Sequence, residues 1–321
     1  MLELIFRALA YSSCIALMAG SITLIYMATG TFNFAHASMI AWAFYIVYTL
    51  QTFLGGSPYY YLPAAALFSG FLGVLTYIGV NRYLLKKGAG MVTLMMSTLG
   101  VDLIMFSALN MFADYLSEVH KLYSRQIILE VFDFSLGKVF GAELKGSTIV
   151  SLILVFAVLI SLHLFLTKTD FGISMRAAIE NPALAGLLGT NPDLIYLSAW
   201  FIGGAIAGLG GGLMSMITAG YPAVGMYLIV TMFAGSIVGG LYSIYGSLLG
   251  GFLIGLSEYL GIYGLSGAIG PWILAYRQVI PLTAMVITLL IYPMGLGGIQ
   301  WSKLLEKTGL KIKLPFKLGG E

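Results

Sequence analysis

The chain has 321 residues, of which 59% are hydrophobic, 41 are glycine and only 9% are charged. Soluble domains carry about 25% charged residues, so this chain has too little polar surface to face water on all sides. Its mean hydropathy of +0.95 and its small net charge of +3 exclude a soluble globular enzyme, a secreted domain and a nucleic-acid-binding protein. The composition predicts a protein whose main solvent is the lipid bilayer.

Unbroken apolar runs of about 20 residues predict helices that cross the hydrocarbon layer. Such runs fall at 8–29, 37–54, 60–80, 91–112, 147–167, 194–218, 226–244, 246–264 and 279–299. The stretch 219–264 is dense in glycine and hard to divide, so a piece that enters and leaves on the same side also fits it. We therefore expect an all-α, polytopic membrane bundle of about 8–10 transmembrane helices with at least one broken or re-entrant segment, forming a single domain over residues 1–300.

Lysine and arginine clusters indicate which ends of the spans face the cytoplasm. They lie in the 81–90 turn, in the 168–193 loop and in the tail 301–321. Placing all three clusters inside is consistent with the expected spans, and it puts the N-terminus outside and the C-terminus in the cytoplasm. The sequence thus predicts a multi-pass protein of the cell (plasma or inner) membrane with a basic cytoplasmic tail.

This orientation places the longest polar segment, residues 113–146, outside the cell. Within it Val131–Phe140 alternates apolar and polar residues around Leu136-Gly137, which predicts a short β-hairpin. The mixed charges of the segment fit either a solvated connector or a surface that steers a soluble partner.

Glycines recur at four-residue spacing in three of the expected helices, a pattern that places them on one helix face and lets backbones approach closely. They are Gly204, Gly208 and Gly212, then Gly235 and Gly239, then Gly251 and Gly255. The stripes fit packing within one chain or a subunit interface. From Gly261 to Gly270 a glycine stands at every third position, which predicts a packed turn at the outer surface.

Polar residues at membrane depth are candidates for a translocation pathway, because unsatisfied polar groups cannot face lipid cheaply. Asn33, Phe34 and His36 lie between the first two expected spans, where a broken helix lining a pathway and a merely structural turn are both compatible with the sequence. Asp102 lies in the middle of the fourth span and is either functional or a neutral acid held by hydrogen bonds. Glu258, nearer a span end, has the same two interpretations, and Arg277 is expected to snorkel to the outer interface.

The 168–193 loop is more structured than a simple connector needs to be. Its pattern predicts a short helix over 172–179, a break at Asn181-Pro182 and a second helix over 183–188 that ends at Gly189. Its apolar residues suit insertion into a groove of another protein or contact with lipid headgroups.

No constellation for catalysis, metal or nucleotide binding is present in the sequence. His36, His120 and His163 lie far apart, without a second ligand at i+3 or i+4. The phosphate-binding pattern G-x-x-x-x-G-K-[ST] does not occur. We expect no catalytic residue, metal or cofactor in this chain.

Three stretches, in order along the chain, resemble motifs of the branched-chain amino-acid ABC transporter permeases. Asn33-Phe34-Ala35-His36 resembles the N-F-A-H signature, although Ala37 and Ser38 depart from the residues that usually follow it. The run from Phe171 to Asn191 resembles the family's coupling loop, and the run from Gly239 to Gly251 resembles its G-G-x-G-S-x-x-G-x-x-x-G-G stretch. The resemblance assigns ATPase coupling to Arg176, Ala177, Glu180, Asn181, Pro182, Ala185 and Gly189. The four-residue spacing, together with the glycines of the third stretch, assigns helix packing to Gly204, Gly208, Gly212, Gly239, Gly240, Gly250 and Gly251.

The resemblance covers roughly residues 8–300 and implies a permease subunit of an ABC importer. Such a subunit translocates a branched-chain or hydrophobic amino acid, or a small polar solute such as urea or an amide, by alternating access. The implied partners are a second permease subunit in a homo- or heterodimer, two cytoplasmic ATPase subunits that use the ATP, and an extracytoplasmic substrate-binding protein. Tyr242 stands where the family commonly has a glycine. This departure and those at Ala37 and Ser38 concern the exact substrate more than membership of the family.

Two alternatives remain open at this point. An ion-coupled secondary transporter would need paired intramembrane ionisable groups, for which Asp102 and Glu258 are the candidates. An intramembrane enzyme would need a nucleophile with a base, or a carboxylate cluster for a metal.

Overall fold

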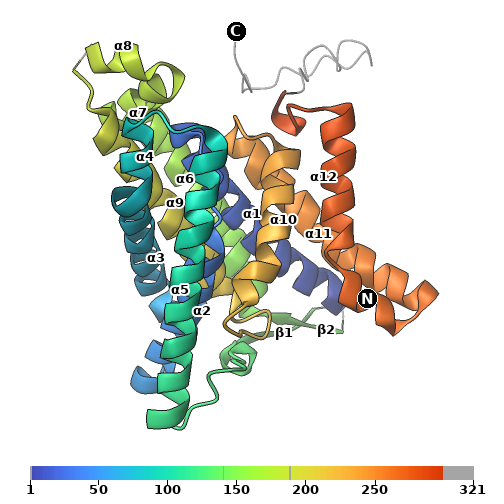
Figure 1. Ribbon diagram of the computed structural model, residues 1–321. Coiled ribbons are helices and arrows are strands. Elements are labelled where there is room, and N and C mark those ends of the chain that lie inside the picture. Colours follow the sequence, from blue (N-terminus) through green and yellow to red (C-terminus); the bar gives the residue numbers. More distant parts are fainter. Residues whose placement is uncertain (1, 140, 188, 299–321) are drawn as a thin grey trace, which may run out of the picture.

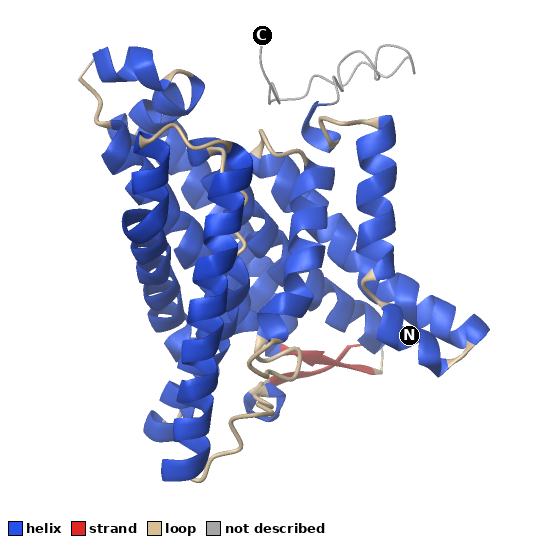
Figure 2. Ribbon diagram, viewed as in Figure 1, coloured by secondary structure: helices blue, strands red, loops and turns tan. Residues whose placement is uncertain are grey.

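The structure is a computed structural model that describes residues 2–139, 141–187 and 189–298 (Figures 1 and 2). In these ranges it contains twelve α-helices and one two-stranded sheet. The expected all-α membrane bundle is confirmed. The expected basic tail, 301–321, lies outside the described residues.

The α-helices follow one another as α1 (Leu2–Thr29), α2 (His36–Leu54), α3 (Leu62–Thr76), α4 (Arg82–Lys86), α5 (Met91–Val119), α6 (Gly146–Lys168), α7 (Asp170–Glu180), α8 (Pro182–Leu187), α9 (Pro192–Met214), α10 (Val224–Gly239), α11 (Ile244–Ile269) and α12 (Val279–Ile291). A π-helical turn, Tyr77–Asn81, joins α3 to α4. Short 3-10 turns cover Pro58–Tyr61, Glu130–Phe132, Pro271–Tyr276 and Leu296–Gly298, and the strands are β1 (Ser135–Val139) and β2 (Ala142–Lys145).

Eight helical segments of the described chain are long and apolar enough to cross a membrane. The expected span over 226–244 corresponds to α10, which has 16 residues and is about 24 Å long at 1.5 Å per residue. That is shorter than a hydrocarbon layer of about 30 Å. Compared with the expected span, α10 starts two residues earlier and ends five residues earlier. The backbone before it is irregular.

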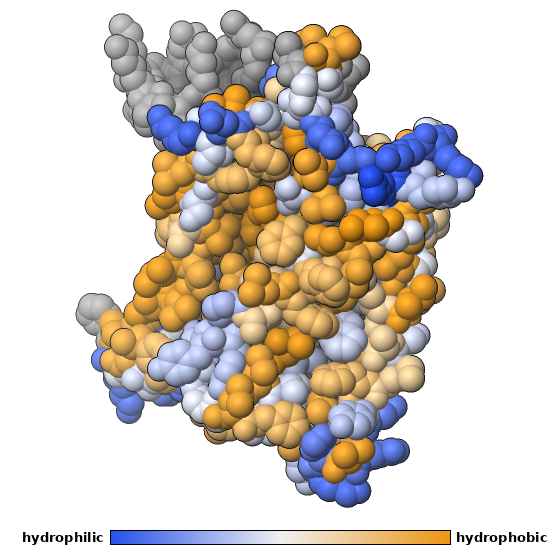
Figure 3. Space-filling model, turned by 90° about the vertical axis from the view of Figure 1, so that its left-hand side faces the viewer, coloured by the Kyte–Doolittle hydropathy of each residue, from blue (hydrophilic) through white to orange (hydrophobic). Residues whose placement is uncertain are grey.

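The two ends of the bundle carry different elements. Helices α4, α7 and α8 lie at one end, and the β1–β2 hairpin lies at the other (Figure 1). A space-filling view shows an apolar surface between hydrophilic atoms at the two ends, as a protein surrounded by lipid requires (Figure 3). An ion pair between Arg82 and Asp193 confirms that the two basic loops lie at the same end.

Helix α1 is the centre of the bundle, and glycines bring its neighbours close. A Cβ atom on Gly251 or Gly255 of α11 would meet the α1 backbone. Gly204 and Gly208 of α9 lie in the same way against the α3 backbone, and Gly212 lies against side chains of α2 and α3. At the crossing of α10 and α11, Gly239 touches Gly246 and Gly250. These stripes are therefore in contact within the chain.

The glycine-rich stretch after Gly261 is helical and not a packed turn, so that prediction is wrong. Helix α11 continues to Ile269, and the chain turns at Gly270, whose φ is +122°. Gly264 and Gly267 have no neighbour within 4 Å of an added Cβ. Glycines at every third position do not remove the backbone hydrogen bonds of a helix. The turn instead occurs at Gly270, because glycine adopts a positive φ without steric cost.

The hairpin predicted within Val131–Phe140 is present, but its turn is displaced from the predicted position. The chain reverses between Val139 and Ala142, where Gly141 has a φ of +82°. Gly137 has a φ of +105° and lies in an irregularity of the ladder between Ser135 and Lys138. Helix α5 extends to Val119, so the irregular backbone of the 113–146 segment begins after this residue.

Candidate functional site

The α1–α2 break, residues Gly30–Ala35, is held by a compact set of polar contacts. Asn33 Nδ2 lies 2.8 Å from His36 Nδ1, and His36 Nε2 lies 3.1 Å from Ser21 Oγ. Asn33 Oδ1 accepts a hydrogen bond from the Ala35 N–H at 3.1 Å. Asn33 and His36 are both fully buried. These two side chains therefore fix the shape of the break, and a surface for substrate near it must come from other residues.

Helix α5 supports the break from one side, at membrane depth. The Phe34 N–H donates to Thr98 Oγ1 at 3.1 Å, and the Ser38 N–H donates to Asp102 Oδ1 at 3.0 Å. Thr98 and Asp102 lie about 10 and 16 Å along α5 from Met91 at 1.5 Å per residue. The break therefore lies inside the bundle, as a broken helix lining a pathway requires.

Asp102 serves as a cap for α2 that is supplied by a different helix. Its carboxylate is buried and accepts an N–H from the first turn of α2, while its backbone carbonyl accepts the Ser38 hydroxyl at 3.0 Å. Negative charge is favourable at a helix N-terminus. Among the described residues Asp102 has no ion pair.

An aromatic cluster gathers around the break from distant parts of the sequence. We define it as Tyr26, Phe32, Phe34, Phe233 and Tyr242. The ring of Phe233 in α10 lies 5.8 Å from Phe32 and 5.2 Å from Phe34, and Tyr26 lies 4.6 Å from Phe32 and 6.0 Å from Tyr242. Phe32, Phe34 and Phe233 are half-buried and Tyr242 is exposed. The sequence singles out Phe34 and Tyr242 separately and does not bring the five rings together, because no local pattern links α1 to α10.

The second intramembrane acid is part of a different cluster. Glu258 is buried, and its Oε1 accepts a hydrogen bond from Arg277 Nε at 2.6 Å. The Tyr11 hydroxyl lies 3.1 Å from both Glu258 oxygens, and the Arg277 guanidinium stacks over the Tyr11 ring at 4.9 Å. Arg277 thus supplies the cation that the buried Glu258 carboxylate needs, a contact that the snorkelling prediction did not include.

The 168–193 loop forms the predicted helix, break and second helix. Thr169 caps α7 by accepting the Gly172 N–H at 3.0 Å, and Asn181 Oδ1 accepts the Leu184 N–H at 3.0 Å at the start of α8. Gly189 has a φ of +89° after α8. Helix α7 begins two residues earlier than predicted.

This α7–α8 hairpin presents one face to the bundle and another outward. Met175, Ala178 and Ala185 are buried, so Ala185 can act only by fixing the hairpin. The exposed residues include Asp170, Ile173, Arg176, Ala177, Glu180, Asn181, Leu184, Leu187 and Gly189. The outward face thus combines charged with apolar side chains.

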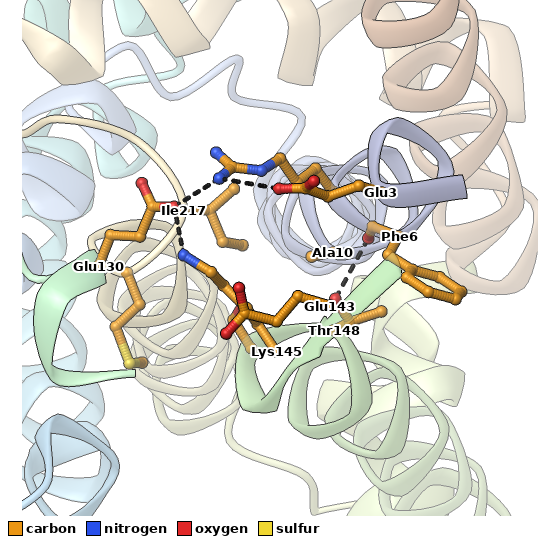
Figure 4. Close-up of a pocket in the computed structure, with 11 residues that line it drawn as sticks. Glu3, Phe6, Ala10, Glu130, Glu143, Lys145, Thr148 and Ile217 are labelled. Atoms are coloured by element: carbon orange, nitrogen blue, oxygen red, sulfur yellow. Dashed lines mark hydrogen bonds and ion pairs between the residues drawn. The ribbon is translucent and has the colours of Figure 1, made fainter. Parts of the chain in front are cut away.

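At the opposite end, an ionic network fixes the segment between α5 and α6 to α1. Glu130 lies 2.8 Å from Arg7 and 2.5 Å from Lys145 (Figure 4). Arg7 also lies 3.6 Å from Glu3. The cavity among these side chains holds about 10 Å³, which is room for a single water molecule. This network is a structural connection and not a solute site.

No metal centre is found within the described ranges, where no three His, Cys, Asp or Glu side chains come close enough to hold an ion. His120 packs against Phe53 and Tyr115, and His163 contacts Tyr245. The three histidines thus lie in three different environments.

Comparison with known proteins places this geometry in a family. The family model described as "Branched-chain amino acid transport system / permease component" matches residues 4–290. The "Probable branched-chain amino acid transport permease protein LivH" of Methanocaldococcus jannaschii is 39% identical over 297 residues, covering 92% of each chain. The "High-affinity branched-chain amino acid transport system permease protein BraD" of Pseudomonas aeruginosa is 26% identical over 307 residues, covering 92% of this chain and 95% of its own.

The corresponding LivH protein of Escherichia coli K12 is 24% identical over 305 residues, covering 92% of this chain and 95% of its own. No solved structure matches the chain. The match to the family and to the archaeal protein runs over almost the whole sequence and includes the break, the hairpin and the glycine crossings. The chain belongs to the family of permease components of branched-chain amino acid transport systems and is a multi-pass membrane transport protein.

Proposed function

We propose that this chain is the permease subunit of an ATP-driven importer that carries a branched-chain or similar hydrophobic amino acid into the cell. It pairs with a second permease subunit, and two cytoplasmic ATPase subunits hydrolyse the ATP. A soluble binding protein delivers the amino acid to the end that bears the β1–β2 hairpin. The pathway opens alternately to the two sides of the membrane, and the C-terminal tail faces the cytoplasm.

The observation that carries this proposal is the α7–α8 hairpin. It lies at the end of the bundle where the basic loops meet, and its outward face bears Ile173, Leu184 and Leu187 beside Arg176 and Glu180. Exposed apolar side chains on a short helix suit a hydrophobic groove on a partner protein. Such a groove on an ATPase subunit would receive the hairpin and move it during the ATP cycle.

The aromatic cluster supports an apolar cargo. Its half-buried rings lie beside the break, whose own polar side chains are already paired with one another. Ligand sites combine apolar and aromatic walls with a few polar groups. A branched aliphatic side chain would contact the rings of Phe34 and Phe233, and free backbone groups of the break would bind the zwitterion weakly enough to release it.

The ion-coupled alternative is less favoured by the placement of the two intramembrane acids. Asp102 contacts the first turn of α2, whereas Glu258 contacts Tyr11 and Arg277. A coupling-ion site needs its ionisable groups together. Each of these two carboxylates has its own partners.

Uptake by the reconstituted transporter tests the proposal. Proteoliposomes that contain the permease, its ATPase subunits and ATP should accumulate labelled leucine when the binding protein is added outside. We expect uptake to require ATP and to resist ionophores that collapse ion gradients. Uptake that needs an ion gradient and no ATP would establish a secondary transporter instead, and competition by urea or acetamide would establish a polar solute as the cargo.

A further inference from the structure

A π-helical turn, Tyr77–Asn81, interrupts the helix that leads from α3 to α4. Turns of this kind are rare and occur frequently at functional sites. One carboxylate holds this turn at both ends. The Tyr77 hydroxyl donates to Asp193 Oδ1 at 3.2 Å, while Arg82 Nη2 and Lys86 Nζ lie 3.0 and 2.9 Å from Asp193 Oδ2.

Asp193 follows the α7–α8 hairpin closely in the sequence, at the start of α9. Helix α8 ends at Leu187, and Asn191 caps α9 by accepting the Asp193 N–H at 3.0 Å. Only a short connector therefore separates the hairpin from the carboxylate that holds the π-turn. A displacement of the hairpin would act on Asp193 before it acts on the rest of α9.

On its other side the π-turn contacts the α1–α2 break. Asn81 is fully buried, and its Oδ1 accepts a hydrogen bond from Thr31 Oγ1 at 3.4 Å. Its Nδ2 has no hydrogen-bond partner among the described residues. A buried donor without an acceptor is costly, so the Asn81 amide is the least satisfied group along these contacts.

These contacts form one continuous path from the hairpin to the break. We infer that Asp193 is a positioning residue that transmits the movement of the α7–α8 hairpin through the π-turn to the α1–α2 break. Coupling between distant sites needs an element with two discrete arrangements, and we assign this part to the π-turn, whose Asn81 amide nitrogen is unpaired in the arrangement described. The inference rests on the proposed function, because it requires a partner that moves the hairpin.

Charge-neutralising variants of the reconstituted transporter test this role. Asp193→Asn and Arg82→Gln should lower leucine uptake about tenfold, a typical size for a coupling effect, while ATP hydrolysis and thermal stability stay close to wild type. Lys86→Gln and Lys87→Gln are a matched pair, because Lys86 contacts Asp193 whereas Lys87 stacks on Tyr83 at 4.4 Å. Uptake should fall in the first and remain normal in the second.

Hydrogen exchange provides a readout that a merely structural role would not change. ATP binding should alter amide exchange in residues 170–187 and in residues 77–81 of the wild-type complex. In Asp193→Asn the change should persist in 170–187 and disappear in 77–81. Normal uptake by Asp193→Asn, or a parallel loss of uptake, ATP hydrolysis and thermal stability, would overturn the inference. Wild-type exchange in 170–187 that does not respond to ATP would overturn the proposed function itself.

Discussion

At the scale of single residues, the environment of Asp102 determines what this acid can do. The carboxylate accepts an N–H group at the start of α2, and no cation lies against it in the described part of the chain. Both the neutral acid and the amide of asparagine can accept this hydrogen bond. The identity of the acceptor oxygen therefore matters more than a full negative charge.

Two substitutions at this position should behave differently. Asp102→Asn keeps the acceptor and should retain uptake within about threefold, with a loss of helix-terminus stabilisation of about 0.3–1 kcal/mol. Asp102→Leu leaves the Ser38 N–H unpaired and should lower the free energy of unfolding by about 1–3 kcal/mol. Uptake at equal membrane levels and thermal unfolding in detergent measure the two effects. An equal and complete loss of uptake in both variants would show that a charged carboxylate is required.

Residue identities could be predicted from the sequence more readily than residue partners. Asp102, Asn33 and His36 stand out because polar groups at membrane depth are rare. The pairing of Glu258 with Arg277 could not be predicted, because the two residues are joined only when the turn after Gly270 brings the start of α12 back against α11. The partners of a buried charge depend on tertiary packing, which a local pattern does not contain.

At the scale of helices, two glycines in similar helical backbone should respond oppositely to alanine. A Cβ on Gly239 would overlap the backbone of Gly246 and Ser247, whereas Gly264 faces open space. Gly239→Ala should lower the free energy of unfolding by about 1–3 kcal/mol through overpacking. Gly264→Ala should raise it by about 0.5–1 kcal/mol, because alanine loses less entropy in a helix. Thermal unfolding of the purified permease measures both, and a destabilised Gly264→Ala would contradict this account of the crossing.

The α7–α8 hairpin could be predicted in outline because its signals are local. Thr169 and Asn181 are good capping residues, and Pro182 and Gly189 stand where a helix begins and where one ends. The structure adds which face of the hairpin points outward. Glu180 is exposed on that face and Ala185 is buried, so Glu180 is the better position for testing contact with a partner.

Substitution of Glu180 should therefore separate coupling from folding. Because its side chain is exposed, Glu180→Ala should leave thermal unfolding unchanged while reducing substrate-stimulated ATP hydrolysis about tenfold or more. Asp170→Ala removes another exposed carboxylate from the same helix and is the matched control. ATP hydrolysis is measured in the complex with binding protein and leucine. Stimulation of Glu180→Ala at the wild-type level would exclude a role in coupling.

At the scale of the whole molecule, hydropathy predicts the long helices because backbone groups in lipid must be satisfied within the segment. It fails at α10, where the polypeptide between Met214 and Val224 is irregular and is held in place by a bridge between Gly220 and Ile127. Protein and not lipid satisfies the backbone there, so a window that averages hydropathy cannot locate the boundary. The orientation of the C-terminal half in the membrane therefore depends on whether α10 crosses the bilayer.

Cysteine labelling in right-side-out membrane vesicles tests this orientation. The single native cysteine, Cys14, is buried, so the unmodified protein should not react with a membrane-impermeant maleimide and provides the blank. Lys138→Cys, in the β1–β2 hairpin, should be labelled directly, whereas Lys87→Cys should be labelled only after permeabilisation. Tyr242→Cys lies after α10 in an exposed loop, and it should behave like Lys87→Cys if this short helix crosses the bilayer. Direct labelling of Tyr242→Cys would mean that α10 returns to the outer side of the membrane. The start of α11 and the Tyr242 edge of the aromatic cluster would then also lie on the outer side, which contradicts the proposed pathway.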